Sequence, residues 1–171
     1  MASRSRVAPS GARDSATGDP IVYRGVFGEI AGEHAQVASL VDQVAGTIEV
    51  RVRQDLFPQI RNGLLTHARA EEETFYPVLR EIPELERLVT QCLEDHAEVA
   101  RYLDRLDVKD KSTKLWGDLF DEMKRVVDRH VSREENELFP RAQERIEAAA
   151  SEAMRDRYKR AAEPPDPLRP L

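Results

Sequence analysis

Apolar residues recur every three or four positions along four stretches of the chain, which is the spacing of one face of an α-helix. The stretches are residues 20–46, 50–81, 83–107 and 113–148. A polar run at 107–112 separates the last two, and Ser112 or Thr113 is suited to cap the helix that follows. The pattern therefore predicts an all-α protein with four long helices.

Prolines and polar stretches indicate where these helices bend and end. Pro58 either sets the start of the second helix or kinks it, and Pro77 and Pro140 should bend the second and fourth helices. Ser151 is suited to cap a short further helix through about Ala161. We therefore expect a flexible tail over 1–19, one helical domain over 20–150, and a short helix with an irregular tail over 151–171.

Polar residues interrupt the apolar face of each predicted long helix. They are histidines and glutamates: His34 on the first helix, His67 and Glu71 on the second, His96 on the third, and His130 and Glu134 on the fourth. Each glutamate follows a histidine by four positions, so both side chains lie on the same face. A carboxylate on a buried face is costly unless a cation compensates its charge, which makes these residues candidate metal ligands.

The candidate ligands belong to an internal repeat. The segment E-H-A-Q-V at 33–37 returns as D-H-A-E-V at 95–99, and H-A-R-A-E-E-E-T-F-Y-P at 67–77 returns as H-V-S-R-E-E-N-E-L-F-P at 130–140. These segments contain all 4 histidines of the chain. The chain is therefore a doubled helix pair, and its short connections predict an antiparallel up-down four-helix bundle.

In such a bundle the candidate ligands would meet at the central axis. Nitrogen and carboxylate ligands without thiolate suit iron or manganese, and the ligand types leave zinc open. The set is too large for one tetrahedral zinc and too small to saturate two octahedral ions. Two metal ions with open coordination positions fit it best. One such histidine alone is more often a hydrogen-bonded core residue, so the inference rests on the whole set.

Other polar and aromatic residues lie near the candidate ligands in sequence. Several acidic residues fit a solvated face or a supporting role better than ligation: Glu72, Glu73, Glu135 and Glu137. Three tyrosines could approach the site, although aromatic residues at helical spacing usually belong to the core: Tyr23, Tyr76 and Tyr102. We leave all of these residues out of the predicted ligand set.

Composition narrows the partners and the compartment. A net charge of −6 argues against an electrostatic grip on nucleic acid, which needs a clustered basic surface. No apolar run approaches the roughly 20 residues that span a bilayer, so no membrane association is expected. The single cysteine, Cys92, cannot form an internal disulfide and fits a small buried residue, which favours a reducing, cytoplasmic location.

The order His, His-x-x-x-Glu, His, His-x-x-x-Glu resembles the hemerythrin-like family, also called the HHE cation-binding domain. The resemblance covers about residues 20–148 and extends to the phrases A-E-E-E-T-F-Y-P and R-E-E-N-E-L-F-P. It implies two iron ions, joined by an oxo or hydroxo bridge, inside a four-helix bundle. It also implies terminal histidine ligands and two bridging glutamates: His34, His67, His96 and His130, with Glu71 and Glu134.

One departure from the family bears on function. Oxygen-carrying hemerythrins have a fifth histidine on the third helix, whereas the positions four residues before and after His96 are Cys92 and Ala100. Reversible oxygen carriage depends on one iron having all its coordination positions filled and the other having one position open. A symmetric set of two histidines per iron therefore disfavours an oxygen transporter.

The leading hypothesis is a di-iron protein that binds or turns over hydrogen peroxide, O2 or NO, with catalase-like peroxide decomposition as its reaction. The alternative is a module that binds or senses iron, oxygen or nitric oxide without catalysis. A structural bundle that holds zinc is the third. The sequence identifies no protein partner and no organic substrate.

Overall fold

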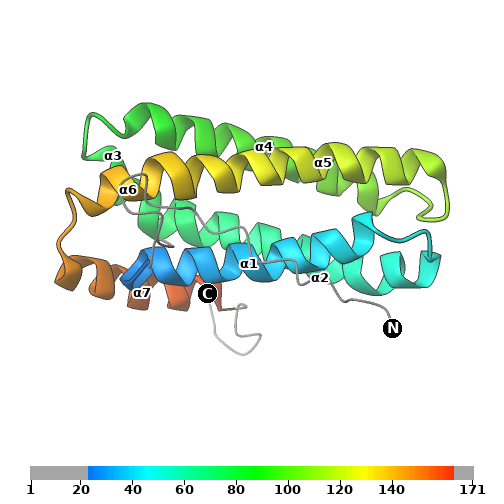
Figure 1. Cartoon of the computed structure of the whole chain (residues 1–171), viewed down its shortest axis with the longest axis horizontal. Coiled ribbons are helices and arrows are strands. Elements are labelled where there is room, and N and C mark those ends of the chain that lie inside the picture. The colour runs from blue at the N-terminus through cyan, green and yellow to red at the C-terminus, as the bar shows by residue number, and fades with distance from the viewer. Residues whose placement is uncertain (1–22, 164–171) are drawn as a thin grey trace, which may run out of the picture.

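The described part of the chain is a bundle of four long helical rods with a further helix packed along its side (Figure 1). The structure, a computed structural model, describes residues 23–163, and this range contains no strand. The elements are α1 (Gly25–Ala45), α2 (Val50–Ala70), η1 (Glu71–Phe75), α3 (Tyr76–Arg80), α4 (Glu86–Asp107), α5 (Lys114–Arg133), η2 (Glu134–Leu138), α6 (Phe139–Gln143) and α7 (Ala148–Ala162). Successive rods run in opposite directions, which confirms the predicted up-down bundle.

The helix boundaries follow the predicted pattern with local differences. The first helix begins at Gly25 rather than at 20, and the fourth rod ends at Gln143 rather than at 148. Thr113 caps α5 as predicted, since its side chain accepts a hydrogen bond from the Trp116 backbone N–H at 3.2 Å. Pro58 lies inside α2 and does not set its start. The three-part division of the chain stays a prediction, and its tail over 1–19 lies outside the described residues.

Ser151 does not cap the last helix, contrary to the prediction. The helix α7 begins at Ala148 and contains Ser151, which is buried. The Ser151 hydroxyl accepts a hydrogen bond from the backbone N–H of Val26 at 3.3 Å. Because Val26 lies in the first turn of α1, where N–H groups have no partner within the helix, Ser151 supports the start of α1 instead.

Two π-helical turns, η1 and η2, interrupt the second and fourth rods, and each begins at a candidate ligand glutamate. In η1 the backbone N–H of Tyr76 bonds to the carbonyl of Glu71, and Pro77 follows directly. Proline has no N–H, so the ordinary helical bond is missing at that point. The turn η2 repeats this arrangement before Pro140. The prolines therefore mark irregular turns where bends were predicted, and these turns are π-helical.

The core consists of two apolar clusters with a polar layer between them. In the first cluster, Phe27, Phe75 and Phe139 pack edge to face. The second cluster is built around Phe57 and Trp116. On each rod the candidate histidine lies between residues of the first cluster and residues of the second. The bundle thus places four histidines at one level along its length.

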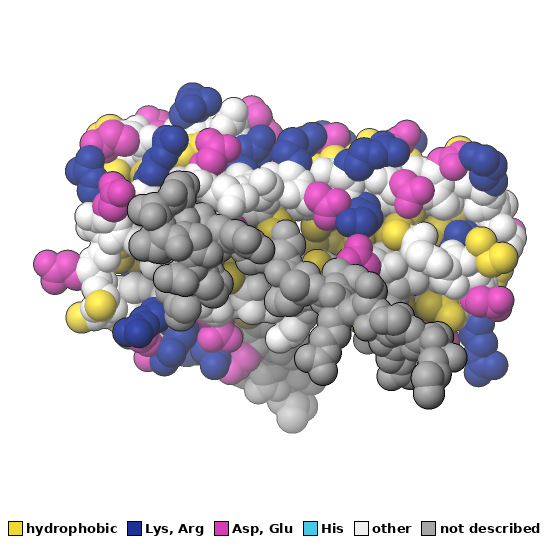
Figure 2. Space-filling model, viewed as in Figure 1, with side chains coloured by type: hydrophobic (Ala, Val, Ile, Leu, Met, Phe, Trp, Pro, Cys, Tyr) yellow, Lys and Arg dark blue, Asp and Glu magenta, His cyan; other side chains and the backbone are white. Residues whose placement is uncertain are grey.

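The surface carries mixed charge. Figure 2 shows acidic and basic side chains interspersed over the helices on the face in view. Within residues 23–163, every helix is too short or too polar to cross a membrane.

Candidate metal centre

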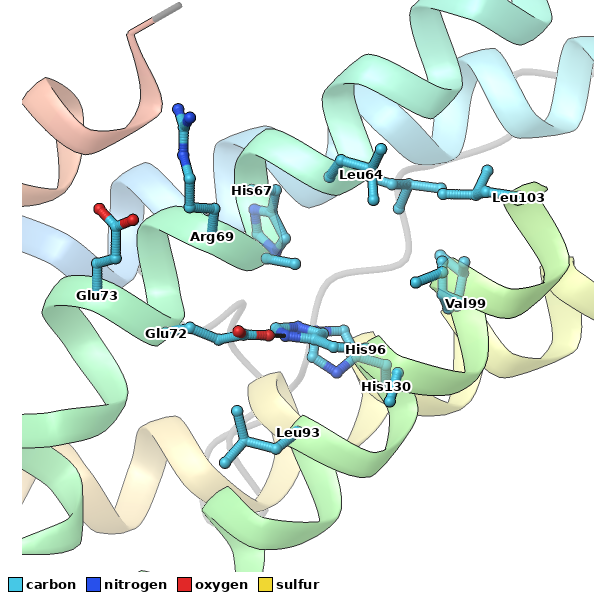
Figure 3. A pocket seen from close by; sticks show the side chains of 15 residues that line it. Leu64, His67, Arg69, Glu72, Glu73, Leu93, His96, Val99, Leu103 and His130 are labelled. Carbon is cyan, nitrogen blue, oxygen red and sulfur yellow. Dashed lines mark hydrogen bonds and ion pairs between the residues drawn. The ribbon is translucent and has the colours of Figure 1, made fainter. Parts of the chain in front are cut away.

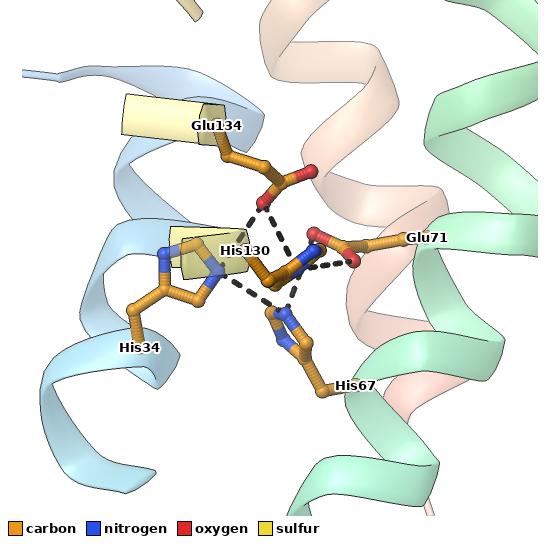
Figure 4. A group of neighbouring side chains, drawn as sticks. All are labelled: His34, His67, Glu71, His130 and Glu134. Atoms are coloured by element: carbon orange, nitrogen blue, oxygen red, sulfur yellow. Dashed lines mark hydrogen bonds and ion pairs between the residues drawn. The ribbon is translucent and has the colours of Figure 1, made fainter. Parts of the chain in front are cut away.

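The predicted ligands lie together in the polar layer between the two clusters. All of them are buried, the two glutamates completely. Five of them converge in Figure 4, and each offers one ligand atom within 4.8 Å of the others: His34, His67, Glu71, His130 and Glu134. His96 joins this group, because its Nε2 lies 3.2 Å from Glu71 Oε2 and 3.3 Å from His130 Nε2.

The imidazoles form two facing pairs. The Nε2 atoms of His34 and His67 are 3.2 Å apart, and those of His96 and His130 are 3.3 Å apart. Glu71 reaches both pairs, since its Oε1 lies 3.4 Å from His67 Nε2 and its Oε2 lies 3.2 Å from His96 Nε2.

Glu134 occupies an equivalent position. Its Oε2 lies 3.3 Å from His34 Nε2 and 3.7 Å from His130 Nε2, so it also approaches both pairs. Each carboxylate therefore lies where a ligand shared by two metal ions would lie, with one ion at each histidine pair.

Three of the imidazoles bind a carboxylate through the outer nitrogen, Nδ1. Each of these contacts is 2.9 Å long: His34 with Glu135, His67 with Glu33, and His96 with Glu72. A carboxylate acceptor keeps the hydrogen on Nδ1 and leaves the Nε2 lone pair directed inward for a metal. Glu72 and Glu135 thus take the supporting role foreseen for them, whereas Glu73 and Glu137 are exposed.

The buried polar atoms of this layer fit a cation. Among the described residues, Glu71 Oε1 and Glu134 Oε2 have no hydrogen-bond partner. Burial raises the pKa of Glu71, and the negative charge of Glu134 raises it further. Burial alone would lower the pKa of His34, but its close contacts with the carboxylates of Glu134 and Glu135 raise it to about 10. The layer therefore attracts positive charge, as a metal site must.

Comparison with known families decides which kind of bundle this is. The family described as Hemerythrin HHE cation binding domain matches residues 26–142. The chain belongs to this family. The match covers all of the buried histidines and both glutamates, and the HHE domain binds metal cations.

A curated relative of this HHE domain is a much longer protein. A DNA nickase from Nostoc sp. strain PCC 7120 is 26% identical over 129 residues, which is 75% of this chain and 36% of the nickase. The chain thus spans little more than a third of that relative's length. No solved structure matches the chain.

Tyr76 lies between the two buried carboxylates of the HHE centre. Its hydroxyl donates to Glu134 Oε1 at 2.8 Å and lies 3.1 Å from Glu71 Oε2. Burial raises the pKa of Tyr76 well above its ordinary value, and the charge of Glu134 adds to this. The hydroxyl therefore keeps its hydrogen and acts as a donor.

Two further residues that contact the centre were missed by the sequence analysis. Tyr158, on α7, donates to Glu33 Oε2 at 2.5 Å and lies 3.0 Å from His67 Nδ1. Glu33 directly precedes His34 on α1, but its carboxylate contacts His67 on α2. No spacing along the chain therefore connects Glu33 with His67. Tyr158 lies outside the repeat and belongs to no motif.

The other residues near the centre take structural roles. Tyr23 donates to the backbone carbonyl of Glu135, and Tyr102 packs against the second cluster. Cys92, which holds one of the positions around His96, is buried in the first cluster, and burial raises the pKa of its thiol. A neutral buried thiol is a poor metal ligand.

Proposed function

We propose that this chain is a non-haem di-iron protein that binds and decomposes peroxide. Each facing histidine pair would hold one iron ion, and Glu71 and Glu134 would bridge the two ions. The observation that carries the proposal is that each buried carboxylate lies within 4.0 Å of both histidine pairs. The ligand types suit iron, and a shared pair of carboxylates suits an ion that takes more than four ligands.

Two iron ions, when bound, supply the two-electron exchange that converts two molecules of hydrogen peroxide into one of oxygen and two of water. The protein contributes the surroundings. Two imidazoles and two shared carboxylates would leave coordination positions on each ion for a small molecule. The Tyr76 hydroxyl holds a proton beside both carboxylates, and the apolar clusters shield the layer on its two sides along the bundle.

Oxygen evolution tests this proposal. Hydrogen peroxide is added to the iron-loaded full-length protein in an oxygen electrode, and oxygen release is expected. The variant His67→Ala should lose it, because one ion then keeps a single imidazole. Thr66→Ala, at the neighbouring position, should retain it. Oxygen evolution no greater than that of His67→Ala would overturn the proposal.

The alternative, a module that binds or senses iron, oxygen or nitric oxide without catalysis, predicts bound iron without oxygen evolution. Metal analysis and a visible spectrum of aerobically purified protein separate it from a structural zinc bundle, because ferric pairs absorb in the near ultraviolet and zinc does not. A reduced protein that takes up oxygen and releases it intact under vacuum would indicate carriage.

A further inference from the structure

The two histidine pairs are not supported equally. In the first pair, His34 and His67 each bind a carboxylate through Nδ1. In the second pair only His96 does so. The Nδ1 of His130 is buried and has no hydrogen-bond partner among the described residues. The internal repeat makes this difference unexpected, because it provides an acidic residue at the equivalent position.

Asp95 is the counterpart of Glu33 in the repeat. Each of these acids directly precedes a ligand histidine, and Glu33 accepts a hydrogen bond from the Nδ1 of His67 on the paired helix. By the same relation, Asp95 would accept a hydrogen bond from the Nδ1 of His130. Its side chain is shorter than that of glutamate by one methylene, and its contacts lie elsewhere.

Two arginines hold Asp95 away from this role. Its Oδ1 accepts hydrogen bonds from Arg129 at 2.6 and 3.0 Å, and its Oδ2 accepts one from Arg133. The equivalent positions in the first half of the repeat are Thr66 and Ala70, which carry no charge. The arginines thus engage both oxygens of Asp95, and neither oxygen accepts a hydrogen bond from His130 Nδ1.

Helix α7 increases the difference between the halves. It packs against α1 and α2, and Tyr158 fixes the Glu33 carboxylate beside His67. In the described part of the chain, no further helix lies along α4 and α5 in this way (Figure 1). The first pair is therefore braced from outside the bundle, and the second is not.

A cavity of about 490 Å³ reaches the less supported pair from between α2, α4 and α5 (Figure 3). Both members of the second pair, His96 and His130, line it, but only His67 of the first pair does. Its walls are mainly apolar: Leu64, Leu93, Val99, Ala100, Leu103 and Val127. A small neutral molecule therefore has a route to the second pair.

We propose that the centre has one firmly held metal position, at His34 and His67, and one labile position, at His96 and His130, where incoming small molecules bind. This inference rests on the proposed two-metal site. Losing the outer partner of a ligand histidine typically lowers metal affinity about 10–100-fold, so the second ion should leave about 10–100 times faster than the first. The two positions thus differ through the partners of their ligands, although each has two histidines.

Release of ferrous iron tests this difference. Full-length protein loaded anaerobically with ferrous iron is mixed with ferrozine, and release is followed by absorbance. The unmodified protein should release iron in two phases of equal amplitude. Glu33→Gln should accelerate the slow phase about 10–100-fold. Asp95→Asn, the matched change in the other half, should leave both rates unchanged. Release in one phase, or equal acceleration by both variants, would overturn the proposal.

A further variant separates these effects from loss of folding. Tyr158→Phe keeps the packing of α7 but removes the hydrogen bond to Glu33, so it should accelerate the slow phase alone. Acceleration of the fast phase instead would show the assignment to be wrong. Because no peroxide is added, the result does not depend on turnover. Fewer than two irons per chain would refute the two-metal site itself, whereas two irons leaving together would refute only this inference.

Nitric oxide binding tests the route. Ala100 lines the cavity, and its repeat counterpart, Ala38, is exposed on α1. Nitric oxide is added anaerobically to the ferrous protein, and binding is followed by absorbance. Ala100→Phe should slow binding severalfold, whereas Ala38→Phe should not. Equal rates in the two variants would exclude the cavity as the route.

Discussion

Glu134 and Glu137 lie one helical turn apart, yet only Glu134 is buried in the polar layer. Glu134→Ala should lower bound iron by about half or more, because it removes a carboxylate that approaches both histidine pairs. Glu137→Ala, an equal truncation of an exposed side chain, should keep its iron. Metal analysis of both purified variants checks this. Full iron content in Glu134→Ala would contradict its assigned role.

Tyr76 offers a more conservative test of the same layer. Tyr76→Phe keeps the aromatic ring but removes the hydroxyl that lies between Glu71 and Glu134. Iron affinity, measured by competition with a chelator, should fall about tenfold, because the carboxylates lose a partner that orients them. Tyr102→Phe, in the second cluster, should bind iron as the unmodified protein does. An equal loss in both variants would point to a general packing effect.

The sequence could predict which residues meet at the centre because each carries its own signal. A histidine or glutamate on an apolar helix face, such as His67 or Glu71, is costly to bury unless a polar group or a cation compensates it. Their action as ligands remains a prediction. Glu33 and Tyr158 could not be found this way, because their contacts join different helices and no spacing along the chain records them.

At the scale of elements, the periodicity predicted the rods but not their internal form. An α-turn and a π-turn differ by one residue, and the apolar spacing tolerates that difference, so only Pro77 and Pro140 indicated an irregularity. Ser151 shows the opposite error. A small polar residue before a helical stretch resembles a cap, but its partner is the first turn of α1.

Gly25 tests this contact between α1 and α7. Its φ is +59°, and an added Cβ would lie 2.3 Å from Ser151 Oγ. Gly25→Ala should therefore destabilise the protein by about 1–2 kcal/mol or more from the backbone conformation alone. Gly32→Ala, within the same helix and with nothing within 4 Å of the new Cβ, should stabilise it by about 0.5–1 kcal/mol. Urea unfolding measures the change in the free energy of unfolding for both variants. Changes of the same sign would contradict this explanation.

At the scale of the whole molecule, metal should support the fold. Without it, the bundle encloses two carboxylates and four imidazoles between apolar clusters. At a free metal concentration of about 100 times Kd, binding of each ion adds about 3 kcal/mol to the free energy of unfolding. For a chain of this size that corresponds to roughly 6–12 °C in Tm for each ion.

Thermal melting with and without a chelator measures this contribution. The chelator should lower the Tm of the unmodified protein, and it should lower that of Glu134→Ala by less, because this variant has less metal to lose. An unchanged midpoint in the unmodified protein would show that the bundle folds independently of metal.

The doubled helix pair made the bundle predictable, since two similar helix pairs with short connections can pack together in only a few topologies. The position of α7 was not predictable in the same way. It lies outside the repeat, and the short apolar pattern that predicts a helix there does not indicate which groove that helix covers. The difference between the two halves of the centre therefore became visible only in three dimensions.

The π-turns give the second and fourth rods a tolerance to changes in chain length. In η1 the backbone N–H of Tyr76 bonds to the carbonyl of Glu71, five positions earlier, whereas an α-turn spans four. Deleting one exposed residue from η1, such as Glu73, would make this same bond an ordinary α-helical one, so Tyr76 and α3 would keep their direction. A deletion within α2 would instead rotate every later residue of that rod by about 100°. A single-codon deletion in η1 should therefore leave the bundle intact, whereas the same deletion ahead of His67 should turn the ligands away from the centre.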